Sequence, residues 1–214
     1  MKILFFGDSI TDMGRKRDSD GHIYSYGNGY VFLVGSELFT KEPGKYEIIN
    51  RGISGNRIVD LYARVKADVW YEKPDVLSIL IGVNDIWHDL KEKPNGTEID
   101  RWAKMYRILI EDTKKALPDT KIILCEPFVL EGINSQGEGR WEYFEGIRDY
   151  AKIVESLAKE YDLYFVPLQE KFDNIAKKYD SSYFLYDGIH PHIAGASVIA
   201  KEWLKVFEKS ILGL

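Results

Sequence analysis

The segment Lys2-Ile3-Leu4-Phe5-Phe6-Gly7-Asp8-Ser9-Ile10 joins a short, mostly apolar run to a turn that carries a hydroxyl group. Such a run, ended by a glycine, is typical of a strand that is buried on both faces of a parallel sheet. Four further short runs rich in apolar or β-branched residues follow it along the chain, at 46–50, 75–81, 120–125 and 163–167. With residues 2–6, the chain therefore has five predicted strands.

Amphipathic segments lie between these strands and predict helices. Apolar side chains recur at helical spacing in four places, at 57–71, 97–117, 142–161 and 196–211. At the second of them, Thr97 and Asp100 are placed like a capping box. Strands that alternate with helices predict an α/β protein whose parallel sheet is covered by helices on both faces.

The bulk properties fit one soluble domain spanning residues 1–214. Apolar residues make up 45% of the chain and charged residues 29%, and the net charge of -5 argues against nucleic acid or an anionic membrane as a partner. The first apolar run is too short for a signal peptide, and no stretch approaches the roughly 18 apolar residues of a membrane span. The lone Cys125 excludes an intramolecular disulfide, so we expect a cytoplasmic protein.

Polar residues follow three of the predicted strands. Ser9 comes after the first strand, Gly52 after the second and Asn84 after the third. Parallel sheets bind ligands beyond the carboxyl ends of their strands, so these three residues are expected at one edge. Asp187 and His190 lie in the loop before the last helix, which can return to the same edge.

An acid and an imidazole three residues apart can serve a serine nucleophile. One turn can bring the Asp187 carboxylate to one nitrogen of His190, and the other nitrogen would then face Ser9. Taken alone, Ser9 would more simply cap a helix. His192 competes with His190 as the base, but it lies five residues from Asp187 and is expected to begin the final helix.

Three donors are available for an oxyanion hole, namely the Ser9 N–H, the Gly52 N–H and the Asn84 side chain. Taken singly, Gly52 could be a turn glycine and Asn84 a structural turn residue. Nearby carboxylates are expected to hold loops by hydrogen bonding, and they are Asp8, Asp12 and Asp85.

The sequence resembles a known family in four blocks. Gly7-Asp8-Ser9, Gly52, Gly82-Val83-Asn84-Asp85 and Asp187-Gly188-Ile189-His190-Pro191 are similar to the conserved blocks of the SGNH hydrolases, also called GDSL esterases. The resemblance implies a flavodoxin-like three-layer α/β/α sandwich with a five-stranded parallel sheet in the order 2-1-3-4-5. It also implies nucleophile Ser9, base His190, acid Asp187 and oxyanion donors from Ser9, Gly52 and Asn84.

Within that family the chain is most similar to intracellular acetyl-xylooligosaccharide esterases. The similar segments are Asn50-Arg51-Gly52-Ile53-Ser54-Gly55-Asn56, Lys73-Pro74-Asp75-Val76 and Ile81-Gly82-Val83-Asn84-Asp85-Ile86-Trp87. The expected activity is hydrolysis of a short acyl ester, principally acetyl, on a soluble carbohydrate, with no cofactor and no metal.

Aromatic residues in the loops that face the site fit a sugar leaving group, because their rings can pack on the apolar faces of sugars. These residues are Tyr24, Tyr26, Trp87, Trp141, Tyr183 and Tyr186. Of all residues near the site, Asp8, Trp87 and Tyr186 are expected to contact substrate. The Gly-rich loop 130–141 is interpreted as a substrate loop or a subunit contact, and a homo-oligomer is compatible with the surface aromatics.

Three alternatives stay open at this point. One is an esterase or thioesterase acting on small lipids or acyl thioesters, like a lysophospholipase. Another is a non-catalytic sugar-binding protein. The third is a metal-dependent hydrolase, which leaves Ser9, Gly52 and Asn84 unexplained. Its ligands would be Asp8, Asp12, Asp187, His190 and His192.

Overall fold

Five parallel strands form one sheet in the order β2-β1-β3-β4-β5, as the family resemblance implies. The computed structural model describes residues 1–137 and 139–214. The strands are β1 (Lys2–Gly7), β2 (Glu47–Gly52), β3 (Val76–Leu80), β4 (Lys121–Cys125) and β5 (Tyr164–Val166). Each overlaps one of the five predicted runs, so the strand prediction is confirmed.

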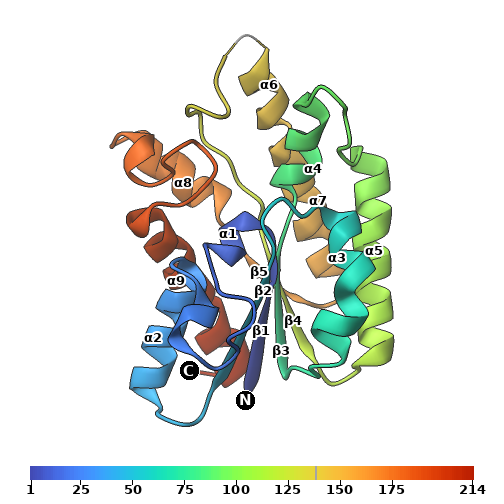
Figure 1. Cartoon of the computed structure of the whole chain (residues 1–214), viewed down its shortest axis with the longest axis vertical. Coiled ribbons are helices and arrows are strands. Elements are labelled where there is room, and N and C mark those ends of the chain that lie inside the picture. Colours follow the sequence, from blue (N-terminus) through green and yellow to red (C-terminus); the bar gives the residue numbers. More distant parts are fainter. Residues whose placement is uncertain (138) are drawn as a thin grey trace.

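Helices cover both faces of the sheet. The α-helices of the described residues are α1 (Ser9–Asp12), α2 (Tyr30–Lys41), α3 (Ile58–Val65), α4 (Val83–Trp87), α5 (Ile99–Ala116), α6 (Arg140–Glu145), α7 (Ile147–Glu160), α8 (Gln169–Ala176) and α9 (Ile193–Phe207). Figure 1 shows α2 and α9 on one side of the sheet and α3, α5 and α7 on the other. The predicted three-layer α/β/α arrangement is therefore confirmed.

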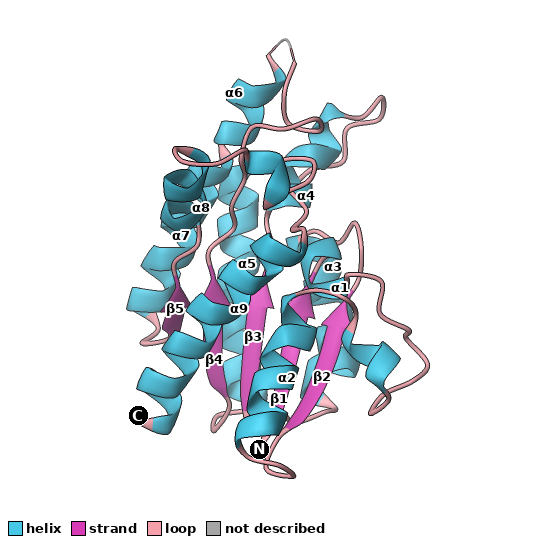
Figure 2. Ribbon diagram, turned by 90° about the vertical axis from the view of Figure 1, so that its left-hand side faces the viewer, coloured by secondary structure: helices cyan, strands magenta, loops and turns pink. Residues whose placement is uncertain are grey.

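The register of the sheet aligns the carboxyl ends of β2, β1 and β3. Gly7, the last residue of β1, pairs with Gly52 on β2 and with Leu80 on β3. Figure 2 shows the strands running toward the end of the molecule where α1, α4 and α6 lie. Since the chain order reverses on either side of β1, this end carries the topological switch point at which α/β sheets bind ligands.

Some helix boundaries differ from the prediction. The segment 142–161 is interrupted at Gly146, which separates α6 from α7. The predicted capping box at Thr97 is wrong, because α5 begins at Ile99 and its N-cap Glu98 makes no side-chain capping bond. The Thr97 side chain is buried instead. Helices α2 and α8 were not predicted from the sequence.

The core fills the space between the sheet and both helix layers. The Trp203 ring packs on Phe5, with centroids 5.0 Å apart, and its indole N–H donates to Ser78 Oγ at 2.9 Å. Cys125 is a buried thiol beside Ser78, and burial raises its pKa to about 12. Within the described residues, none of the helices has the length and apolar character that crossing a membrane requires.

Candidate active site

Ser9 is placed by the sharp transition from β1 into the short helix α1. The chain leaves β1 at Gly7, and the Asp8 carboxylate caps α1 by accepting the Ile10 N–H at 3.0 Å. The Ser9 side chain lies at the N-terminus of this helix, with its Oγ 2.8 Å from His190 Nε2. A hydroxyl at this distance can pass its proton to the imidazole.

Asp187 holds the opposite nitrogen of the same ring. Asp187 Oδ2 lies 2.6 Å from His190 Nδ1, and Asp187 Oδ1 accepts the N–H groups of Ile189 and His190 at 3.0 and 2.7 Å. This network places the ring hydrogen on Nδ1 and leaves Nε2 to accept from Ser9. The predicted grouping of Ser9, His190 and Asp187 is therefore present as a hydrogen-bonded chain.

The surroundings of Asp187 keep its carboxylate ionised. Burial by itself would raise the pKa of Asp187, but the hydrogen bonds from His190 and Ile189 lower it to about 2. A permanent negative charge beside His190 stabilises the imidazolium that forms when Ser9 loses its proton.

Asn134 is a member of this network that the sequence did not reveal. Its side-chain amide donates to Asp187 Oδ2 at 2.7 Å, and its backbone N–H donates to the Asp187 carbonyl at 3.0 Å. Asn134 lies in the 130–141 loop, which was interpreted as a substrate loop or subunit contact. Its described part packs against the turn that carries Asp187, and both interpretations of the loop stay predictions. Glu138 in the same loop lies outside the described residues.

Gly52 does not offer its N–H to a substrate, which corrects the prediction that it is an oxyanion donor. The Gly52 N–H donates to Asn50 Oδ1 at 2.9 Å in the buried end of β2. A Cβ at this position would collide with the backbone of Thr11 and Asp12. Glycine is required here because α1 passes directly over β2, so it marks a close packing contact.

Gly55, three residues further on, can offer a ligand the N–H group that Gly52 has already committed to Asn50. The loop that joins β2 to α3 uses its other N–H groups internally: Ile53 donates to Gly7 O, Ser54 to Asp12 Oδ2, Asn56 to Ile53 O, Arg57 to Asp60 Oδ2 and Ile58 to Asp85. Among the described residues, the Gly55 N–H has no acceptor. Its φ of +83° suits glycine, and the space around a Cβ there is open. A backbone donor without an acceptor in a polar loop is available to a ligand.

Asn84 lies at the start of α4, directly after β3, and faces this loop. Its Nδ2 donates to Asn56 O at 3.1 Å, which places the side chain next to Gly55. An amide nitrogen carries two hydrogens, so one remains for a substrate oxygen. The Ser9 N–H also has no acceptor among the described residues. The available donors near the nucleophile are therefore Ser9, Gly55 and Asn84.

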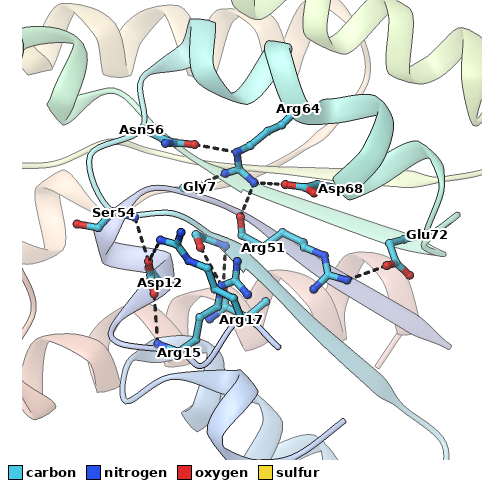
Figure 3. A network of polar contacts seen from close by, with 12 residues as sticks. Gly7, Asp12, Arg15, Arg17, Arg51, Ser54, Asn56, Arg64, Asp68 and Glu72 are labelled. Atoms are coloured by element: carbon cyan, nitrogen blue, oxygen red, sulfur yellow. Dashed lines mark hydrogen bonds and ion pairs between the residues drawn. The ribbon is translucent and has the colours of Figure 1, made fainter. Parts of the chain in front are cut away.

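The three carboxylates expected to hold loops do so. Asp8 caps α1, Asp12 accepts the N–H groups of Arg15 and Ser54, and Asp85 accepts the Ile58 N–H at the start of α3. Figure 3 shows Asp12 between Ser54 and Arg15. Burial raises the pKa of both Asp8 and Asp85 to about 7.

Two of the three residues expected to contact substrate lie beside the site. The Tyr186 ring stacks on the His190 ring with centroids 5.7 Å apart, and the Trp87 ring lies 5.9 Å from it on a tilted plane. Asp8 is different, since only 1% of its surface is exposed. Its expected contact with substrate is therefore wrong, and its carboxylate serves α1.

The five ligands that the metal-dependent alternative needs do not form one group, because among these described side chains only those of Asp187 and His190 contact each other. His192 is exposed and caps α9, with its Nδ1 accepting the Ile193 N–H at 3.0 Å. Asp8 is buried under α1, and Asp12 is occupied by loop N–H groups. Across residues 1–137 and 139–214, no three His, Cys, Asp or Glu side chains are grouped so that they could hold a metal ion.

Comparison with known proteins agrees with this geometry. The model of the GDSL-like Lipase/Acylhydrolase family matches residues 5–198. The acetylxylan esterase of Geobacillus stearothermophilus is 36% identical over 211 residues, which cover 95% of this chain and 92% of that protein. Its crystal structure matches with a TM-score of 0.85 and 33% identity, covering 95% of this chain and 92% of that one.

A crystal structure from Parabacteroides merdae, described as that of a GDSL-like lipase, matches with a TM-score of 0.89 and 38% identity, covering 96% of this chain and 94% of that one. Three structures of the Geobacillus esterase are of catalytic mutants, in which a serine, an aspartate and a histidine are each replaced by alanine. That aspartate and histidine lie three positions apart, as Asp187 and His190 do here.

Proposed function

The chain belongs to the GDSL-like lipase/acylhydrolase family, and from that premise we propose that it is a serine esterase that removes short acyl groups, principally acetyl, from soluble carbohydrates. The observation that carries the proposal is the hydrogen-bonded chain from Ser9 Oγ through His190 to Asp187. A serine hydroxyl bonded to an imidazole that a carboxylate orients is an arrangement that performs acyl transfer through a covalent intermediate.

In the proposed mechanism, Ser9 Oγ attacks the ester carbonyl while His190 Nε2 accepts its proton. The tetrahedral oxyanion is held by the N–H groups of Ser9 and Gly55 and by the side chain of Asn84. His190 then gives the proton to the leaving alcohol, and an acyl-Ser9 ester remains. Water, activated by His190, repeats the sequence and releases the carboxylic acid.

Two observations support a short acyl group and a sugar alcohol. The Trp87 and Tyr186 rings flank His190, and Trp87 is held in place by an edge contact with Phe144 at 5.9 Å. Aromatic rings beside the catalytic base can pack on a sugar face and limit the room for a long chain. A 36% identical relative is an acetylxylan esterase.

The test is hydrolysis of p-nitrophenyl esters from acetate to palmitate, followed by acetylated xylo-oligosaccharides, with a chelator present. The wild type is compared with Ser9→Ala and with Ser182→Ala, which changes an exposed serine. We expect kcat/KM to be greatest for acetate, to fall with chain length, and to be lost only in Ser9→Ala.

Other results would favour one of the alternative functions or contradict the mechanism. Equal or better turnover of long-chain esters, or of acyl thioesters, would favour the lipid or thioester alternative. Turnover that survives Ser9→Ala would contradict the mechanism. Sugar binding without any turnover would favour a non-catalytic protein.

A further inference from the structure

A partly buried arginine on α3, Arg64, connects the separate segments that carry the proposed oxyanion donors. Its Nη2 donates to Gly7 O at 3.1 Å, its Nη1 to Arg51 O at 2.8 Å, and its Nε to Asn56 Oδ1 at 2.7 Å. Figure 3 shows the guanidinium between these three groups and Asp68. One rigid cation therefore contacts the end of β1, the end of β2 and the loop that follows β2.

The acceptors of Arg64 lie next to the donors of the site. Gly7 lies two residues before Ser9, and Asn56 directly follows Gly55. On its other side Asn56 accepts a hydrogen bond through its carbonyl from Asn84. Asn56 is thus held between Arg64 and Asn84, so the loop that presents the Gly55 N–H is fixed from both sides.

The environment of Arg64 is that of a structural cation with no substrate role. Only 16% of its side chain is exposed, and its guanidinium carbon lies 4.3 Å from the centroid of the Phe6 ring. Burial lowers its pKa, and the ion pair with Asp68 opposes that effect. All three of its nitrogens donate within the protein, in the planar fork that an ammonium group cannot reproduce.

We infer that Arg64 is a positioning residue that sets the spacing between the Ser9 and Gly55 N–H groups, an inference that rests on the proposed function. Oxyanion donors stabilise a transition state because they already point at the place where charge develops. Small displacements of such groups cost large factors in rate. Arg64 donates to the Gly7 carbonyl, two residues before Ser9, and to the Asn56 side chain, directly after Gly55, and it touches no reacting atom.

Arg51 provides a matched control for a purely structural arginine. Its side chain is 12% exposed and pairs with Asp20 and Glu72, each at 2.7 Å. Its guanidinium makes no hydrogen bond to the loop 53–57 among the described residues. Arg51→Met keeps the carbonyl that Arg64 contacts and removes a buried cation of similar exposure.

The experiment compares Arg64→Met, Arg64→Lys, Arg51→Met and Ser9→Ala. For each we would measure Tm, kcat and KM for p-nitrophenyl acetate, and the inhibition constant of phenylboronic acid, whose tetrahedral adduct with a serine mimics the oxyanion intermediate. We expect Arg64→Met to lower kcat about 10- to 100-fold with little change in KM, and to weaken boronate inhibition by a similar factor. Arg64→Lys should likewise lower kcat and weaken boronate inhibition.

The Arg51→Met control distinguishes an effect on catalysis from an effect on stability. Arg51→Met should lower Tm while kcat and boronate inhibition stay within about twofold of the wild type. If Arg64→Met and Arg64→Lys lose stability but keep wild-type kcat and boronate inhibition, Arg64 has only a structural role and the inference is wrong. If Arg64→Met fails to fold, the same measurements are made on Arg64→Lys and Asn56→Ala. Asn56→Ala removes only the side chain that accepts from Arg64 Nε.

Failure of the proposed function gives a different pattern. Activity that persists in Ser9→Ala would overturn the serine mechanism, and the positioning role of Arg64 with it. Loss of activity in Ser9→Ala together with unchanged Arg64 variants would overturn the positioning role alone.

Discussion

At the residue scale, Asn84 supplies the one side-chain donor of the proposed oxyanion hole. One of its amide hydrogens is used to hold Asn56 O, and the other is left for the substrate. We expect Asn84→Ala to lower kcat about 100- to 1000-fold, because one donor to the oxyanion is lost. Steady-state kinetics with p-nitrophenyl acetate would measure this.

The control for Asn84 is Asn174→Ala, which changes an exposed asparagine on α8. Its kcat and KM should match the wild type. A wild-type kcat in Asn84→Ala would show that the oxyanion is stabilised by other groups.

Asn134 is predicted to act on catalysis through Asp187. Its amide donates to the same Asp187 oxygen that holds His190, and this bond favours the ionised carboxylate. Asn134→Ala should therefore raise the pKa of Asp187 from about 2 and loosen the orientation of His190. We expect kcat to fall about tenfold with KM unchanged, and activity to be lost at a higher pH on acidification.

A pH–rate profile that extends from pH 8 down to about pH 2 checks this prediction, again with Asn174→Ala as the control. A profile that coincides with that of the wild type would mean that the backbone N–H groups of Ile189 and His190 are enough to hold Asp187.

Sequence reasoning found Ser9, Asp187, His190 and Asn84 because each stands in a motif with a short-range meaning. It chose the wrong glycine because Gly52 and Gly55 stand close together and both suit a turn. What separates them is whether the N–H already has an acceptor, and for Gly52 that acceptor is the side chain of Asn50. Asn134 was missed because it lies 53 residues from Asp187 and no spacing rule joins the two.

At the scale of elements, the N-terminus of α3 depends on a buried carboxylate from another element. Asp85, on α4, accepts the Ile58 N–H at 3.1 Å, and burial raises its pKa to about 7. Below about pH 4 the carboxyl is protonated in folded and unfolded chains alike. Between pH 4 and pH 7 the unfolded chain releases its proton while the folded chain keeps it, so stability falls as the pH rises and levels off above pH 7.

Asp85→Asn removes this titration and keeps an oxygen that can accept from Ile58. We expect the loss of unfolding free energy between pH 4 and pH 7 to be smaller than in the wild type, by on the order of 3 kcal/mol. Urea unfolding at several pH values measures it, with the exposed Asp119→Asn as the control. If the free energy of unfolding changes with pH in the same way for Asp85→Asn and the wild type, the prediction is wrong.

Helices α2 and α8 were not predicted because neither shows a clear helical period of apolar residues. In α2 the first residues, Tyr-Val-Phe-Leu-Val at 30–34, form a continuous apolar run that resembles a buried strand as much as a helix. The packing of α2 against α9 selects the helical form. The short helix α8, with only Gln169 and Phe172 buried, has too few apolar positions to show a period.

At the scale of the whole molecule, the sheet brings together residues that are distant in sequence. Ser9 and His190 are separated by 181 positions, and their contact depends on β1 lying between β2 and β3 and on the turn before α9 returning to the carboxyl edge of the sheet. The parallel sheet could be predicted from strand–helix alternation, and its strand order from the family resemblance. The contacts of the loops at its carboxyl edge could not, because they depend on individual hydrogen bonds.

The most direct test of the serine mechanism is whether Ser9 becomes acylated during turnover. The protein would be mixed with p-nitrophenyl acetate, quenched in acid within the first turnovers, digested and analysed by peptide mass spectrometry, with Ser9→Ala alongside. We predict a burst of p-nitrophenol and one acetyl group on the peptide that contains Ser9, both absent from Ser9→Ala. Steady turnover by the wild type with no acylated Ser9, or an acetyl group carried by another residue, would contradict the account.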